Sequence, residues 1–203
     1  LFRSSSSFGY TVWNNNSLSK YFVNKIPYAF EYTDIQARIG YSHTAYPVLT
    51  TDLTLLVRAE ANAMLGKYAE AVQDLNTEVK AFSGGNLSVT LTGIQDFYRG
   101  INYYTPTEPT PKKKFHTAFS IESTTQEPIL QAILQLRRIM TVGEGWRLQD
   151  VKRYGIVMYR RTLNDSRKVI AVTDTMKEDD PRRAIQLPQD VITAGLPANP
   201  RNK

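Results

Sequence analysis

The chain of 203 residues is long enough for one domain, or two small ones, with a hydrophobic core. Hydrophobic residues make up 41% and charged residues 22%, which excludes a chain that is disordered throughout, and no apolar run reaches the ~18–20 residues of a membrane-spanning helix. The absence of cysteine excludes disulfide bonds, thiolate metal sites and cysteine catalysis, and the net charge is +6.

The first 50 residues are rich in aromatic side chains. Residues 1–46 contain 11 of the 22 aromatic residues, together with a serine run and the triplet Asn14–Asn16, but they show little helical periodicity. We therefore predict that residues 1–50 form loops with short strands. The chain begins at Leu1 without a signal peptide, which indicates a mature product or a fragment.

Residues 51–85 are predicted to form a helical hairpin. Asp52 is placed to cap the first helix, and Gly66 ends it one residue before a second helix over 68–82 begins. The first helix carries an apolar stripe at helical spacing, made of Leu55, Leu56, Ala59 and Ala63. The turn at Gly66 resembles that of a tetratricopeptide repeat, although an array normally needs at least three copies.

The middle of the chain is predicted to be irregular. Residues 86–126 contain three closely spaced prolines, which forbid regular structure locally: Pro106, Pro109 and Pro111. A short strand is expected over 115–121, where aromatic and apolar residues are interspersed with polar ones.

A pair of helices is predicted over residues 127–161. The first begins at Glu127-Pro128 and ends near Met140, and the second runs from Glu144 to Arg161, beyond the helix breaker Gly143. The closing segment, residues 162–203, is polar and rich in proline and is expected to be irregular.

Signals for enzymatic chemistry are weak. His43 and His116 are the only histidines, and neither has a second ligand at metal-binding spacing. No catalytic or nucleotide-binding motif occurs, and the acidic run 178–180 precedes Pro181-Arg182-Arg183, as in a charged turn. We predict that the chain is not an enzyme and that it holds no metal and no cofactor.

The most distinctive local pattern is a ridge of alternating charges. Glu144, Arg147, Asp150 and Arg153 lie three residues apart, so on a helix neighbouring members can pair. This pattern favours a structural clamp. The alternative is a catalytic pair of carboxylates, but the intervening arginines would keep both ionised.

The same pattern carries a family resemblance. Residues 144–155 read Glu-Gly-x-Arg-x-x-Asp-Val-x-Arg-x-Gly, which resembles the late helix motif of the SusD/RagB family of outer-membrane nutrient-binding lipoproteins. The chain departs from the family's upstream Glu-Arg…Glu pattern, because Leu136 precedes Arg137 and Met140 replaces the second acid.

Further segments agree with the family in chain order. Residues 55–61, with Arg58 and Glu60, resemble its Leu-Arg-Ala-Glu-Ala helix, and the hairpin containing residues 74–76 follows. Residues 187–191 and Asn199-Pro200 resemble its closing segment. The family's chains are longer than this one, so we interpret residues 1–203 as the C-terminal part of such a protein.

The resemblance implies a mainly α-helical, SusD-like fold with helical hairpins, long irregular loops and few short strands. It also implies a non-enzymatic protein at the outer surface of the outer membrane. Such a protein binds a nutrient, usually a glycan and sometimes a peptide, and covers a SusC-like TonB-dependent transporter. Membrane attachment is expected only through a lipid anchor that this chain does not contain.

Candidate ligand-binding residues follow from the chemistry of sugars, whose C–H faces stack on aromatic rings while their hydroxyls bond to amides and acids. Trp13 is the first candidate, because it precedes three asparagines in an aromatic segment. Tyr10 and Tyr21 follow, and Tyr103 with Tyr104 is the reserve pair. The alternative for each ring is a place in the core.

Two other functions remain open from the sequence. One is a helical-repeat scaffold that binds a protein or peptide without any role in transport. The other is nucleic-acid binding, because residues 136–168 contain nine Lys/Arg against three acidic residues. We expect this charge to be a solvated helix face and predict no nucleic-acid partner.

Overall fold

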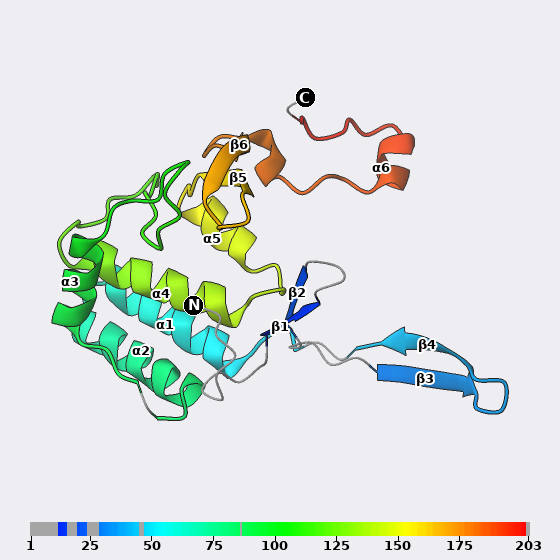
Figure 1. Cartoon of the computed structure of the whole chain (residues 1–203), viewed down its shortest axis with the longest axis horizontal. Coiled ribbons are helices and arrows are strands. Elements are labelled where there is room, and N and C mark those ends of the chain that lie inside the picture. The colour runs from blue at the N-terminus through cyan, green and yellow to red at the C-terminus, as the bar shows by residue number, and fades with distance from the viewer. Residues whose placement is uncertain (1–11, 16–19, 24–28, 45–46, 86, 202–203) are drawn as a thin grey trace. The chain divides into compact units, whose positions relative to one another are not determined.

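The computed structural model describes residues 12–15, 20–23, 29–44, 47–85 and 87–201, and the chain divides into two compact units, residues 1–90 and 91–203. The described residues form six α-helices, one 3-10 helix and three two-stranded antiparallel sheets (Figure 1). The prediction of a mainly helical protein with few short strands is confirmed.

The first unit begins with two β-hairpins. Strands β1 (Val12–Asn15) and β2 (Lys20–Val23) pair antiparallel, as do β3 (Ala29–Asp34) and β4 (Ile39–His43). The turn between β3 and β4 is closed by Asp34, whose Oδ1 accepts a hydrogen bond from the Ala37 amide at 2.9 Å. Short strands among loops, as predicted for residues 1–50, are therefore present.

Helices α1 (Thr51–Met64) and α2 (Tyr68–Phe82) form the predicted hairpin. The predicted cap, Asp52, is wrong: Thr50 caps α1, because its Oγ1 accepts from the Leu53 amide at 3.3 Å. Asp52 instead lies in the first turn, where the helix dipole favours a carboxylate. The buried apolar residues of this hairpin are Leu53, Leu56, Ala59, Ala63, Ala71 and Leu75.

Two family-like segments hold the hairpin together. The guanidinium of Arg58 on α1 donates to both carboxylate oxygens of Asp74 on α2, at 3.0 and 2.6 Å, and Asn62 donates to Asp74 at 3.2 Å. On α2, the side-chain amide of Asn76 bonds both the N–H and the C=O of Val89, at 2.8 Å each. Glu60, which belongs to the same α1 segment, is buried.

Gly66 ends α1 with a positive φ of 74°, a conformation that costs a residue with a Cβ about 1 kcal/mol. No atom lies within 4 Å of a Cβ added there, so strain rather than crowding is the penalty. We expect Gly66→Ala to lower the free energy of unfolding in urea by about 1 kcal/mol. Gly100→Ala is the control, since Gly100 has equal space and no positive φ. Equal losses in the two variants would contradict this explanation.

The second unit is built on three helices: α3 (Leu91–Gly100), α4 (Gln126–Met140) and α5 (Arg147–Arg153). A hairpin of β5 (Met158–Leu163) and β6 (Val169–Met176) follows, then a 3-10 helix, η1 (Pro181–Arg183), and α6 (Gln189–Thr193). Its buried apolar residues are Ile94, Tyr98, Ile129, Leu130, Ile133, Leu134, Met140, Val151, Tyr154 and Ile156.

Two predictions about residues 86–126 are wrong. Helix α3 lies within the segment expected to be loops, because Ile94 and Tyr98 recur at helical spacing and are both buried. The strand expected over 115–121 is absent from the described residues. Phe115 and Phe119 instead pack on the ring of Tyr154, with centroids 4.9 and 6.0 Å away, and this shared partner explains their spacing.

The second helix of the predicted pair is also shorter than expected. It was predicted over 144–161, but α5 ends at Arg153, and residues from Met158 onward form β5. The helix ends because Gly155 takes a positive φ of 58° and its carbonyl accepts from His116, whose own amide bonds Tyr154. The closing segment, expected to be irregular, contains β6 and α6.

The charged ridge is rearranged around Asp150. Its Oδ1 accepts from the buried Arg137 of α4 at 2.6 Å, and its Oδ2 lies 3.5 Å from Arg147. Arg153 lies over the rings of Phe119 and Tyr154, and Glu144 precedes α5. Asp150 thus pairs with Arg147 along α5, as the sequence pattern predicted, and also joins α5 to α4 through Arg137.

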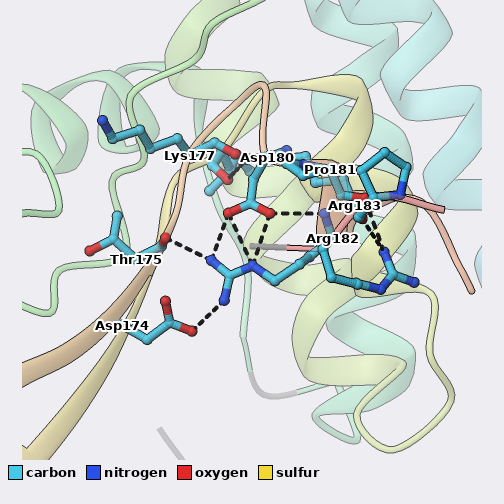
Figure 2. A network of polar contacts seen from close by, with 10 residues as sticks. Asp174, Thr175, Lys177, Asp180, Pro181, Arg182 and Arg183 are labelled. Carbon is cyan, nitrogen blue, oxygen red and sulfur yellow. Dashed lines mark hydrogen bonds and ion pairs between the residues drawn. The ribbon is translucent and has the colours of Figure 1, made fainter. Parts of the chain in front are cut away.

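A second arginine network fixes the chain after β6 (Figure 2). Arg182 donates to Asp180 and to Asp174, each at 2.6 Å, so the predicted charged turn is confirmed. Arg183 donates to three backbone carbonyls at 2.6 Å each: those of Val151, Ile156 and Lys177. This side chain connects the end of α5 to the segment that follows β6.

Candidate ligand-binding site

The first three candidate aromatic residues receive no test from the structure. Tyr10 lies outside the described residues. Trp13 and Tyr21 are in β1 and β2, where Trp13 pairs with Phe22 and Asn14 with Tyr21 along the backbone. Their role in ligand binding stays a prediction.

The reserve pair, Tyr103 and Tyr104, lies in the loop between α3 and α4, next to a cavity of about 260 Å³. The cavity is lined by Gln95, Tyr98, Arg99, Tyr103, Lys112, Ser123, Thr124, Glu127, Pro128 and Gln131. Side chains of α3, α4 and the intervening loop therefore converge on one hollow in the second unit.

Tyr103 presents an aromatic ring at this cavity. The residue is 39% exposed, and its hydroxyl donates to Oε1 of Glu127 at 2.7 Å. The ammonium of Lys112 lies 4.4 Å from the ring centroid. Burial and the hydrogen bond to Glu127 raise the pKa of Tyr103 to about 12, because both favour the protonated hydroxyl.

The loop that carries Tyr103 is held in place by α3 and α4. Lys112 Nζ donates to the carbonyl of Tyr98 at 2.6 Å, and the Tyr104 amide donates to the carbonyl of Lys112 at 2.7 Å. From α4, the buried side chain of Gln131 bonds both the amide and the carbonyl of Lys113. Such anchoring allows a loop with three prolines to present a defined surface.

Tyr104 makes different contacts from Tyr103 and does not line the cavity. Its ring stacks on Tyr159 with centroids 5.3 Å apart, and Lys113 Nζ lies 3.4 Å from its centroid. Its hydroxyl accepts from Arg161 at 2.7 Å. These partners make Tyr104 part of the framework, and Tyr103 is the ring that meets the cavity.

Lys113 lies under Tyr104 as a buried amine. Burial, followed by the positive charges of Arg138, Arg147 and Arg161, lowers the pKa of Lys113 to about 7. Much of the basic stretch 136–168 is likewise used internally: Arg137 and Arg147 contact Asp150, Arg153 covers aromatic rings, and Arg161 holds the loop. These contacts weaken the case for a nucleic-acid surface there.

Polar neutral groups form another part of the cavity wall, and Arg99 adds a cation to it. Gln95 donates to the carbonyl of Thr124 at 3.2 Å and to the hydroxyl of Thr125 at 3.1 Å. Ser123 and Thr124 add hydroxyl groups to the wall. No group of three or more metal-binding side chains occurs in the ranges that the structure describes. The site can bind through stacking and hydrogen bonds.

Sequence reasoning missed most of this wall. Gln95, Lys112 and Gln131 had no motif around them, and Glu127 was noted only as a helix start. The one available signal was the spacing of α3, which would have placed Gln95 and Arg99 on the same face, one turn apart.

The comparison with known families decides the identity of the fold. The family model described as the SusD family matches residues 4–193. The chain belongs to the SusD family. Searches of curated proteins and of solved structures found no match.

Membership in the SusD family fixes the broad function. SusD family proteins bind nutrients at the cell surface, work with a SusC-type transporter and are binding proteins rather than enzymes. They are outer-membrane lipoproteins. Among the described residues of this member, no helix has the length and hydropathy needed to cross a bilayer.

Proposed function

We propose that this SusD family protein captures a glycan at the cavity beside Tyr103 and passes it to a TonB-dependent outer-membrane transporter. The observation that carries the proposal is an exposed ring, Tyr103, at the edge of a hollow lined by amides, hydroxyls, one carboxylate and two cations. Sugars need this combination, because their C–H faces stack on aromatic rings while their hydroxyls exchange hydrogen bonds.

The size of the cavity supports a limited contact with the ligand. Its volume of about 260 Å³ lies just below the ~300–1,000 Å³ of pockets that enclose drug-sized molecules. One sugar unit of an oligosaccharide would enter, and the rest of the chain would stay outside. Family membership favours this role over the helical-repeat scaffold suggested by the hairpin of residues 51–85.

Tyr103→Ala is expected to weaken glycan binding about tenfold, which is the loss of a stacking contact worth about 1–1.5 kcal/mol. Tyr103→Phe keeps the ring and should lose less affinity. A glycan and peptide array would first identify the ligand, and isothermal titration calorimetry would then give the dissociation constants.

Tyr32→Ala is the control, because Tyr32 is an exposed tyrosine on β3, which does not line the cavity. Circular dichroism would show that each variant is folded. A confirmed ligand that binds Tyr103→Ala with unchanged affinity would move the site elsewhere, with Trp13 as the next residue to replace. Binding of peptides alone would contradict the glycan proposal.

A further inference from the structure

The cavity wall contains more positively charged side chains than negatively charged ones. Arg99 and Lys112 carry positive charge and Glu127 carries negative charge, so the lining has one excess positive charge. A neutral sugar needs no such excess. The position and the contacts of each charge show which one is available to a ligand.

Arg99 is the exposed cation at the end of α3. Its Nη1 lies 3.1 Å from Asp96 in a pair one turn apart, and the two side chains are 67% and 62% exposed. Pairs this exposed are held weakly in water. A guanidinium has five N–H donors in a planar fork that fits a carboxylate with two parallel hydrogen bonds. Arg99 can therefore bind an anionic ligand, because exchanging its exposed pair with Asp96 for the ligand costs little free energy.

Lys112 is a fixed cation within the wall. Its ammonium donates to the carbonyls of Tyr98 at 2.6 Å and Ile101 at 3.4 Å, at the end of α3 where the helix dipole favours positive charge. It lies 4.4 Å from the centre of the Tyr103 ring. A sugar stacked near this ring would experience the positive charge of Lys112.

Asp96 is the exposed carboxylate that pairs with Arg99, whereas the two other nearby carboxylates accept hydrogen bonds from the protein around the cavity. Glu127 accepts from the Tyr103 hydroxyl at 2.7 Å and from Gln131 at 3.4 Å. Glu122 caps α4 by accepting from the amides of Thr124, Thr125 and Gln126, which lowers its pKa to about 2. Because Glu122 already occupies that helix end, an anionic ligand has to use Arg99 and Lys112.

We propose that the glycan bound at this cavity is acidic, with a uronic-acid carboxylate that binds Arg99 while its ring stacks on Tyr103. This inference rests on the proposed function and adds the substrate class. Arg99 is the specificity-determining residue, and Lys112 contributes its charge from a fixed position.

The test compares acidic oligosaccharides with their neutral methyl esters, which differ only at the carboxylate. Oligogalacturonate and alginate oligosaccharides are the probes, and calorimetry gives the affinities. We expect the acids to bind at least tenfold more tightly than the esters, and Arg99→Gln to remove that preference. Higher salt should reduce the preference, as expected for exposed charges.

Arg160→Gln is the matched control, because it removes the same charge from an exposed position on β5 outside the cavity lining. Equal binding of acids and esters, or a preference that survives Arg99→Gln, overturns the inference. Neutral-glycan binding that is sensitive to Tyr103→Ala would then leave the proposed function standing. If no glycan binds, the inference and the proposed function fail together.

Discussion

Asp150→Ala is expected to lower the free energy of unfolding by about 3–5 kcal/mol, because the buried Arg137 and the mostly buried Arg147 would lose their shared carboxylate. This is a large part of the ~5–15 kcal/mol that holds a typical domain together. The carboxylate of Asp150 is only 3% exposed, so water could not replace it without opening the helix contact.

Urea unfolding followed by circular dichroism would measure this loss, with Asp165→Ala as the control at an exposed position of the same unit. Asp150→Asn should fall between the two, because it keeps an acceptor without the charge. The ligand affinity of the folded Asp150→Ala protein should stay close to that of the parent. A variant that kept its stability but lost binding would show that Asp150 belongs to a ligand site and not to the framework.

Gly155→Ala is expected to cost roughly 3 kcal/mol or more, because strain and crowding act at the same residue. Gly155 has a positive φ of 58°, and a Cβ there would come within 2.2 Å of the carbonyl oxygen of His116. That oxygen belongs to the backbone, which is itself held because the His116 amide donates to Tyr154 at 2.9 Å. Relief would require moving the loop that carries Phe115.

Gly143→Ala separates the two effects. Gly143 also has a positive φ, 83°, but nothing lies within 4 Å of an added Cβ, so only the cost of about 1 kcal/mol for the strained backbone applies. Urea unfolding of both variants would measure the difference. Equal losses would mean that the close approach of residues 116 and 155 does not limit the fold.

The sequence could predict elements whose pattern is local. The hairpin of α1 and α2 is found as expected, because its signals are all local. Each helix has its own apolar stripe at helical spacing, and a glycine separates the two stripes. The strand β5 was missed because residues 158–161 continue a plausible helix, and the turn at Gly155 depends on a partner 39 residues away. The contact between His116 and Gly155 thus overrides the local preference of this segment for a helix.

In the candidate site, too, the sequence showed the local pattern but not the contacts between distant residues. An aromatic pair before a proline-rich loop was visible in the sequence, but the two rings, Tyr103 and Tyr104, were equivalent on that evidence. Their different roles come from distant partners, since Tyr104 meets Tyr159 and Arg161 while Tyr103 meets Glu127. No spacing rule links residues so far apart.

By itself, the sequence determined the class of the protein. Four motif segments in the family's order over residues 53–200 were enough to indicate the SusD family, because each motif is a short local pattern that can be read without the fold. Only the tertiary structure decided which charges meet. Asp150 pairs with Arg137 of another helix, and Arg183 reaches the carbonyls of Val151 and Ile156. These contacts form because packing removes water, so that buried polar groups must bond to one another. Which groups meet depends on the whole fold and not on residues that are neighbours in the sequence.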